Sequence, residues 1–320
     1  MERPGPAILI TSQAYATKEL LSRIRATAPG AAVFGPEDWK RDGSLIERID
    51  IAFGRLPGEA IARAGRLKWI HTTAAGADWA QREPARSHPA VVTSSHIHAE
   101  SIAEHLFGLL LVLVRGLHHA HRHQLQQTWA KKPQAPLDVL AGKTLCVVGL
   151  GTIGRRCAEL GAAFGMRVIG VRHHVQPTPP AQAVYGPADL CQALAQSDVV
   201  MVVLPGTEQA SGLIGARELS ALPAGAYLLN AGRGKSVDTD ALVQALASGH
   251  LAGAGLDVVD PEPLPPGHPL WGMPNVLITP HTAGLHRTYV AEATEAFLDN
   301  LKRFLSSQPL VGLVDKTLGY

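Results

Sequence analysis

The sequence of 320 residues contains little cysteine. Its three cysteines, Cys146, Cys157 and Cys191, lie far apart and form no CxxC pair. This excludes a fold that depends on a dense disulfide framework. An odd, sparse set of thiols is typical of reduced cysteines inside the cell, and we therefore expect a cytoplasmic protein.

Strong charge of one sign and long hydrophobic runs are also missing. The formal net charge of +2 is too small to indicate a nucleic-acid or membrane-binding surface. The most apolar run, 106–114, is far shorter than the roughly 20 residues that a membrane-spanning helix needs. No signal-peptide core follows Met1. We expect a soluble protein with neither a nucleic-acid partner nor a membrane partner.

What the sequence does contain is a regular alternation of short apolar runs and helical patterns. With 46% hydrophobic and 18% charged residues, the chain is long enough for two globular domains. Such alternation is typical of βα units that build parallel sheets. In the first part we expect strands at 7–11, 31–34, 50–54, 67–72 and 91–94, with helices around 18–26, 45–49 and 58–64.

A long helix is predicted from Ala99 to about Gln127, apolar on all sides in its first half, as at a domain or subunit junction. A second series follows, with strands at 144–149, 167–171, 198–204, 226–230, 253–258 and 275–279, and helices at 153–164, 188–195, 216–221, 238–248 and 289–306.

The predicted fold class is therefore α/β, with two doubly wound parallel-sheet domains. Residues 1–97 and 288–320 would form a flavodoxin-like substrate domain. Residues 98–287 would form a Rossmann NAD(P)-binding domain.

A glycine motif opens the second series. The run from Gly149 through Gly151 to Gly154 follows an apolar strand and begins a helix. In a dinucleotide site these glycines permit a tight turn, close approach of the pyrophosphate, and close packing of helix on strand. The phosphates would lie against the amides of Thr152 and Ile153 at the helix N-terminus. The alternative is a strand–helix turn that binds nothing.

The end of the next strand bears on the choice of cofactor. An NAD-binding site has Asp or Glu there to hold the ribose hydroxyls, but strand 167–171 ends in Arg172, His173 and His174. Because arginine can pair with a 2′-phosphate, we expect NADP(H) to be favoured, with NAD(H) as the second candidate. Alternatively, Arg172 stacks on the adenine and both cofactors bind.

Three further segments place polar residues at strand ends, where a doubly wound sheet forms its ligand crevice. Segment 228–234 contains Arg233, segment 255–263 contains Asp257 and Glu262, and segment 276–284 contains His281. Together with the glycine motif, these segments closely resemble the D-isomer-specific 2-hydroxyacid dehydrogenase family. The resemblance covers nearly the whole chain, including 67–78 and 314–320.

The resemblance implies interconversion of a small 2-oxo acid and its D-2-hydroxy acid. Arg233 would clamp the substrate carboxylate and polarise the carbonyl, because its planar fork matches a carboxylate. His281 would be the general acid in reduction and the base in oxidation. Glu262 would accept the other imidazole N–H and favour the protonated ring. The amides of Ala75 and Gly76 would help to hold the carboxylate.

The resemblance also implies contacts with the cofactor. Asp257 would lie near its nicotinamide end. The other implied contacts are Gly149, Gly151, Thr152, Ile153, Gly154, Arg172, His173, Leu204, Pro205, Thr207, Ala231, Gly232, Arg233, His281, Ala283 and Gly284. Glyoxylate or hydroxypyruvate is the expected substrate. A homodimer is the expected assembly, because the family is typically dimeric.

Each of these polar residues also has a plainer interpretation. Arg233 could be an exposed loop cation, Glu262 a solvated turn residue and His281 a helix cap. The run from His118 to His123 raises the possibility of a metal site. However, no carboxylate or cysteine accompanies it, and helical spacing spreads the rings around the surface, so we expect no metal.

Two other functions are compatible with these features. A dinucleotide-sensing protein, similar to the family's transcriptional corepressor relatives, would bind cofactor without turnover. The presence of Arg233, Glu262 and His281 counts against this function, although such relatives can keep these residues too. A formate or phosphite dehydrogenase shares the fold but uses NAD, which Arg172 disfavours. The leading prediction remains an NAD(P)-dependent 2-hydroxyacid dehydrogenase.

Overall fold

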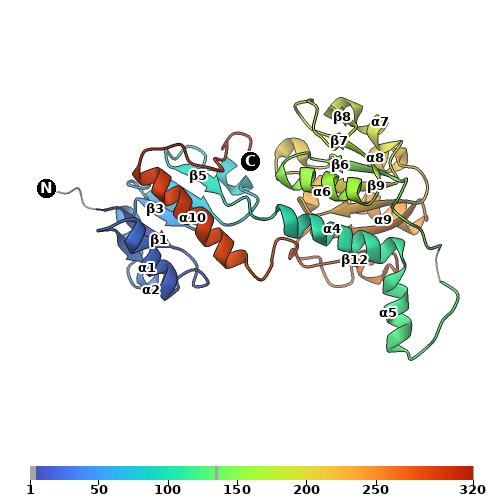
Figure 1. The fold of residues 1–320 in the computed structure, drawn as a ribbon, viewed down its shortest axis with the longest axis horizontal. Helices are drawn as coiled ribbons and strands as arrows, with labels where there is room; N and C mark the ends of the chain where they lie inside the picture. Colours follow the sequence, from blue (N-terminus) through green and yellow to red (C-terminus); the bar gives the residue numbers. More distant parts are fainter. Residues whose placement is uncertain (1–4, 134–135, 320) are drawn as a thin grey trace. The chain divides into compact units, whose positions relative to one another are not determined.

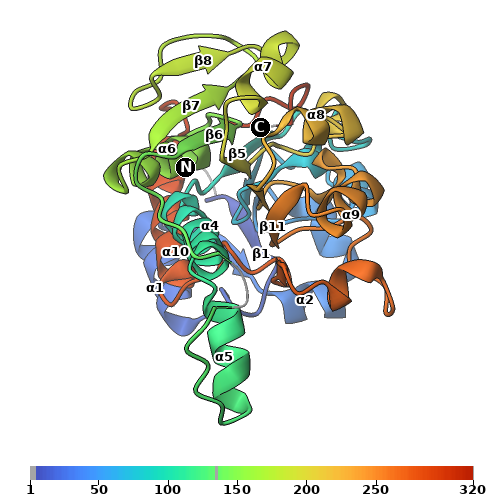
Figure 2. The ribbon, with the colours of Figure 1, turned by 90° about the vertical axis from the view of Figure 1, so that its right-hand side faces the viewer.

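The computed structural model describes residues 5–133 and 136–319, so the extreme ends of the predicted substrate domain lie outside the described residues. The described chain divides into two compact units (Figures 1 and 2). Residues 5–98 and 286–319 form the first unit, and Ala99–Leu285 form the second. The expected boundaries, after residues 97 and 287, fall one and two residues from these divisions.

The first unit contains a five-stranded parallel sheet in the order β2-β1-β3-β4-β5. This is the flavodoxin-like order. The strands are β1 (Ala7–Ile10), β2 (Ala32–Phe34), β3 (Ile51–Phe53), β4 (Trp69–Thr72) and β5 (Val91–Ser94), and the helices are α1 (Lys18–Thr27), α2 (Pro36–Arg41), α3 (Gly58–Arg63) and α10 (Tyr289–Leu305).

The C-terminal helix α10 completes the core of the first unit. In Figure 1 it lies beside α1 over the sheet. Phe297 of α10 stacks on Phe53 and Trp69, with ring centroids 4.3 and 5.4 Å apart. All three side chains are fully buried, so α10 is joined to β3 and β4 by hydrophobic packing.

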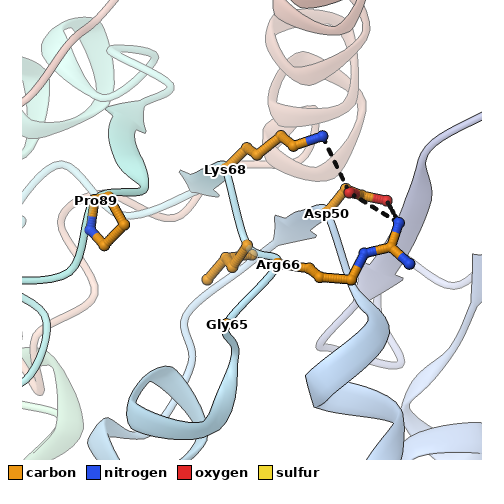
Figure 3. Close-up of a pocket in the computed structure, with 6 residues that line it drawn as sticks. Asp50, Gly65, Arg66, Lys68 and Pro89 are labelled. Carbon is orange, nitrogen blue, oxygen red and sulfur yellow. Dashed lines mark hydrogen bonds and ion pairs between the residues drawn. The ribbon is translucent and has the colours of Figure 1, made fainter.

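Asp50 ties together the amino ends of three strands of this sheet. Its buried carboxylate accepts the Ala7 N–H and lies within 3.3 Å of Arg66 and Lys68. Burial alone would raise the pKa of this carboxyl, but these partners outweigh it and hold the pKa below its usual value. Figure 3 shows this group, which lines a surface depression at the amino ends of the strands. The predicted site residues of this unit, Ala75 and Gly76, instead follow the carboxyl end of β4.

The second unit contains a seven-stranded parallel sheet in the order β12-β11-β10-β9-β6-β7-β8. The strands are β6 (Thr144–Val148), β7 (Arg167–Val171), β8 (Ala183–Tyr185), β9 (Val199–Val202), β10 (Ala226–Asn230), β11 (Leu251–Leu256) and β12 (Val276–Ile278). The helices are α4 (Ala99–Val114), α5 (Leu117–Leu125), α6 (Thr152–Ala163), α7 (Leu190–Leu194), α8 (Ala216–Ala221) and α9 (Thr239–Ala247). The two doubly wound parallel sheets that the sequence predicts are thus confirmed.

The prediction of one long helix from Ala99 to about Gln127 is wrong in one respect. The segment forms two helices, α4 and α5, with a break between them. Gly116 adopts a left-handed φ of 61° between α4 and α5, and the two helices meet at 70°. A residue without Cβ reaches this conformation at little cost, so glycine ends the helix here. Both views show α5 projecting from the body of its unit.

Besides short 3-10 helices, the structure adds the strand β8 and the α-helix α2, which the apolar pattern did not indicate. Both are short and only partly buried, so their sequences carry little hydrophobic periodicity. Among the described helices, no single one is long and apolar enough to cross a membrane. Only the bent pair α4 and α5 meets that test, and only when taken together.

Candidate active site

The predicted site residues of the second unit follow the carboxyl ends of six strands of its sheet. The loops after β6, β7, β9, β10, β11 and β12 carry them. The chain runs outward from β6 to β8 on one side and from β9 to β12 on the other, so the topological switch lies between β6 and β9. Ligands of doubly wound sheets bind at such a switch.

The glycine loop after β6 is shaped for a phosphate group. Gly149 has a φ of +108°, and a Cβ there would lie 2.7 Å from the carbonyl oxygen of Val203. A Cβ on Gly154 would collide with the carbonyl of Gly149. A Cβ on Gly151 would meet nothing within 4 Å. The turn is therefore tight on its protein side and open at the start of α6, where backbone amides and the helix dipole favour an anion.

The loop after β7 presents cationic and imidazole groups. The Arg172 guanidinium donates a 3.1 Å hydrogen bond from Nη1 to Oγ1 of Thr178, and the Thr178 hydroxyl donates to the carbonyl of Gln176. The Thr178 side chain is buried, whereas His173 and His174 are exposed. Thr178 thus orients an arginine at the strand end where an NAD-specific site has a carboxylate.

The loop after β10 is held by Asn230, to which the sequence interpretation gave no role. The buried Asn230 amide donates to the carbonyl of Arg233 and accepts the N–H of Gly232, both at 3.0 Å. The Arg233 guanidinium donates a 2.8 Å bond to the carbonyl of Gly232. A polar residue at the end of the apolar run 226–229 is the signal that could have identified this clamp.

The loops after β11 and β12 bring His281 and Glu262 together. Nδ1 of His281 lies 2.6 Å from Oε1 of Glu262, and the two side chains are 50% and 43% exposed. A carboxylate accepts only, so Nδ1 carries a proton and Nε2 is the nitrogen left for a substrate. His281 also has a left-handed φ of 55°, a strained conformation that is common at functional sites.

Asp257 holds the backbone around His281. Its carboxylate accepts the hydroxyl proton of Thr279 at 2.6 Å and the N–H groups of Thr282 and Ala283 at 2.9 and 3.0 Å. Its carbonyl accepts the N–H of His281 at 2.9 Å. The carboxylate is buried and bonded to protein at both oxygens. The contact with a nicotinamide that the resemblance implies remains a prediction.

The remaining predicted cofactor residues lie in three of these loops, those after β9, β10 and β12. The Thr207 hydroxyl accepts the N–H of Ala210 in the loop after β9, which also contains Leu204 and Pro205. Ala231 lies between β10 and Arg233, and Gly284 follows the buried Ala283.

Ala75 and Gly76 belong to the first unit and follow β4. Their loop is fixed at the carbonyl of Thr73, which accepts a 2.7 Å bond from Nε2 of His98 and a 3.1 Å bond from the Tyr289 hydroxyl. His98, which had no predicted role, therefore supports the predicted carboxylate-binding loop.

Helix α5 carries the four histidines that raised the possibility of a metal site. Within residues 5–133 and 136–319, no group of three or more His, Cys, Asp and Glu side chains is arranged to hold a metal ion. His118 instead contacts the carbonyl of Val112 through Nδ1 at 3.1 Å.

Comparison with known proteins places the chain in a family. Residues 107–283 match the NAD-binding domain of the D-isomer-specific 2-hydroxyacid dehydrogenases. The chain is 34% identical over 279 residues to a glyoxylate reductase from Aeropyrum pernix, a match covering 85% of this chain and 81% of the relative.

Two solved structures are similar over nearly the whole chain. A D-isomer-specific 2-hydroxyacid dehydrogenase from Xanthobacter autotrophicus, in complex with NADPH and MES, has a TM-score of 0.84 and 30% identity, covering 99% of this chain and 100% of that one. An NADPH-dependent glyoxylate/hydroxypyruvate reductase from Sinorhizobium meliloti, in complex with NADP and sulfate, has a TM-score of 0.83 and 26% identity, covering 98% and 100%.

The protein is thus an oxidoreductase with two doubly wound domains. It belongs to the D-isomer-specific 2-hydroxyacid dehydrogenase family, which confirms the resemblance drawn from its motifs.

Proposed function

We propose that the protein is an NADPH-preferring reductase that converts a small 2-oxo acid of the glyoxylate or hydroxypyruvate type to its D-2-hydroxy acid. The observation that carries the proposal is the 2.6 Å pair of His281 and Glu262 on the sheet edge that also bears Arg233 and the glycine loop. These groups supply a proton donor, an anion clamp and a dinucleotide site.

The roles of the residues follow from their chemistry. The glycine loop would hold a nicotinamide cofactor, which would supply a hydride for the keto carbon. Arg233 binds the substrate carboxylate and polarises the neighbouring carbonyl. His281 gives its Nε2 proton to the carbonyl oxygen, so that one hydride and one proton complete the alcohol. Glu262 stabilises the imidazolium before transfer, and Ala75 and Gly76 add amide donors for the carboxylate.

The preference for NADPH is supported by Arg172, which Thr178 orients at the end of β7. It is also supported by the two solved relatives, which are complexes with NADPH and with NADP. Arg172→Ala should lower kcat/KM with NADPH about tenfold or more while NADH is little affected, because only NADPH carries the 2′-phosphate. Arg217→Ala, an exposed arginine of α8, is the matched control. Equal losses with both cofactors would contradict the preference.

The substrate class is supported by the names of the relatives, glyoxylate reductase and glyoxylate/hydroxypyruvate reductase. A panel of 2-oxo acids, followed by NADPH absorbance, tests it. Glyoxylate and hydroxypyruvate should give the highest kcat/KM. A clear preference for another 2-oxo acid would contradict the proposed substrate but leave the reaction type in place.

We assign residues 1–97 and 288–320 to substrate binding and residues 98–287 to cofactor binding, in a cytoplasmic homodimer. The dimer is supported by apolar side chains on and after α5: Leu125 is 72% exposed and Trp129 is 89% exposed. Light scattering should give twice the chain mass. Trp129→Ser together with Leu125→Ser should shift the protein toward monomer, and a wild-type monomer would contradict the assembly.

The decisive experiment compares His281→Gln and Arg233→Ala with the wild type. Each should lower turnover by about 10²–10⁴-fold while NADPH still binds, because the glycine loop is unchanged. Rates like those of the wild type in either variant would contradict the mechanism. Cofactor binding by the wild type without turnover of any 2-oxo acid would instead support the sensing function.

A further inference from the structure

The hydrogen bonds around Asp257 extend beyond the loop of His281 to helix α4. Nε2 of His105, in the second turn of α4, lies 2.8 Å from Oγ1 of Thr279. The Thr279 hydroxyl lies 2.6 Å from Oδ1 of Asp257, and His105 Nε2 is itself 3.7 Å from that oxygen. His105 on α4, Thr279 after β12 and Asp257 after β11 thus form a continuous chain of hydrogen-bonded side chains. The proposed acid–base mechanism gives His105 no role.

The positions of the protons in this chain follow from its chemistry. A hydroxyl has one proton to donate, and a carboxylate accepts only. Thr279 therefore donates to Asp257, and its oxygen must accept from His105. This places a proton on Nε2 of His105, so the chain runs in one direction, from the helix to the carboxylate.

Helix α4 is a rigid anchor for such a chain. Eight of its residues are buried, among them Leu106, Phe107 and Leu110. The helix packs on the sheet of the second unit, where Leu109 lies against Gly255 of β11. The loop that it would hold contains the strained backbone of His281. A strained loop keeps its conformation only when several contacts fix it.

We propose that His105 is a positioning residue for the acid–base loop. Its Nε2–H orients the Thr279 hydroxyl, and Thr279 and Asp257 together hold residues 279–283, so that the His281 imidazole faces Glu262 on one side and the substrate carbonyl on the other. The inference rests on the proposed function of His281. His105 itself passes no proton to the substrate.

A purely structural role for His105 predicts a different outcome. If the imidazole only fills space, any residue of similar volume serves, and losses appear in stability rather than in turnover. If its N–H matters, glutamine, whose amide can donate from a similar position, should replace it better than leucine. The two roles therefore separate in a comparison of His105→Gln with His105→Leu.

The experiment measures kcat, KM for NADPH and melting temperature in these two variants. His105→Leu should lower kcat about tenfold, since small misplacements of a catalytic group are costly. KM for NADPH should stay within about twofold, because the glycine loop after β6 and Arg172 after β7, which are proposed to hold the phosphates, are distant in the sheet from β12. His105→Gln should recover most of the lost kcat.

A second pair of variants tests the same chain without altering α4. Thr279→Val should lower kcat like His105→Leu, and Thr279→Ser, which keeps the hydroxyl, should not. The double variant His105→Leu/Thr279→Val should be no slower than the slower single variant, because both substitutions remove one connected chain. This pair decides the question if His105→Leu does not fold.

Three results would overturn the inference: wild-type kcat in both His105→Leu and Thr279→Val, equal losses in His105→Leu and His105→Gln, or additive losses in the double variant. His281→Gln, assayed in parallel, separates this failure from failure of the proposed function. If His281→Gln loses turnover and His105→Leu does not, only the positioning role is wrong. If His281→Gln keeps turnover, the proposed function is wrong.

Discussion

Two histidines, one in each unit, show how surroundings decide what an imidazole can do. His71 lies inside strand β4 of the first unit and is fully buried. Its ring nitrogens pair with the hydroxyls of Thr93 and Ser95 at 2.8 and 3.1 Å. Burial, with a smaller contribution from His96, lowers the pKa of His71 to about 3, so this ring stays neutral.

His281 differs in each of these respects. It follows strand β12 instead of lying within one, its side chain is half exposed, and its partner is the carboxylate of Glu262. A carboxylate stabilises an imidazolium, whereas a hydroxyl in a dry core does not. The comparison teaches that acid–base capacity comes from a charged partner at an open strand end, and not from the histidine itself.

The largest expected effect comes from removing the charge that distinguishes the two histidines. Glu262→Gln keeps a polar group beside His281 but removes the negative charge, and kcat for 2-oxo acid reduction should fall by about 10²–10⁴-fold. Steady-state NADPH oxidation measures it. Glu59→Gln, an exposed glutamate of α3, serves as the control. A fall of less than about threefold would mean that the negative charge of Glu262 is not what gives His281 the acid–base capacity that His71 lacks.

A smaller effect is expected on stability, through His71. The folded pKa of about 3 lies below the unfolded value of 6.5, so below pH 6.5 the unfolded chain takes up a proton that the native ring refuses. Stability is therefore unaffected above pH 6.5 and is lost as the pH falls toward 3. Acidification from pH 7.5 to pH 5 should therefore lower the free energy of unfolding by about 2 kcal/mol through this group.

Urea unfolding of the wild type and of His71→Leu at both pH values checks this prediction. The variant should lose less stability on acidification, because leucine does not titrate. His121→Gln, on the exposed face of α5, should keep the wild-type pH dependence. Parallel pH profiles for His71→Leu and the wild type would show that the buried histidine is not the source.

The smallest effect concerns the loop after β4. Tyr289→Phe removes one of the two side-chain donors to the carbonyl of Thr73, and His98 still holds it. The loss of one hydrogen bond of about 1 kcal/mol should raise KM for the 2-oxo acid about two- to fivefold, with kcat unchanged. Tyr227→Phe in β10 is the control. An unchanged KM would mean that Tyr289 does not help to position the predicted carboxylate-binding loop.

Much of the fold could be predicted from periodicity, because each buried strand is a short apolar run with a turn residue after it. The glycine motif was informative for the same local reason, since a missing Cβ at Gly149 and Gly154 serves a turn within a few residues. The break at Gly116 was missed because helical residues continue on both sides of it, while the backbone conformation of one glycine changes the direction of the helix.

The supporting contacts of the candidate site could not be predicted in this way. Thr279 and His105 act through partners that lie 22 and 174 residues away along the chain. A hydrogen bond depends on ångström-scale placement, and a strand end in a sequence carries no information about which neighbour lies beside it.

By itself, the sequence determined the two doubly wound sheets, the glycine loop, and the residue types on which the acid–base and carboxylate chemistry depends. Each of these follows from local pattern and from the chemistry of individual side chains. Only the tertiary structure decided that Asp257 and Thr279 hold the loop of His281 and that His71 is a neutral core residue. The structure also supplied the 2.6 Å geometry of the His281–Glu262 pair, which the family resemblance had implied. The reason is physical: burial and long-range pairing arise when distant segments pack together, and packing sets the charge and direction of a side chain.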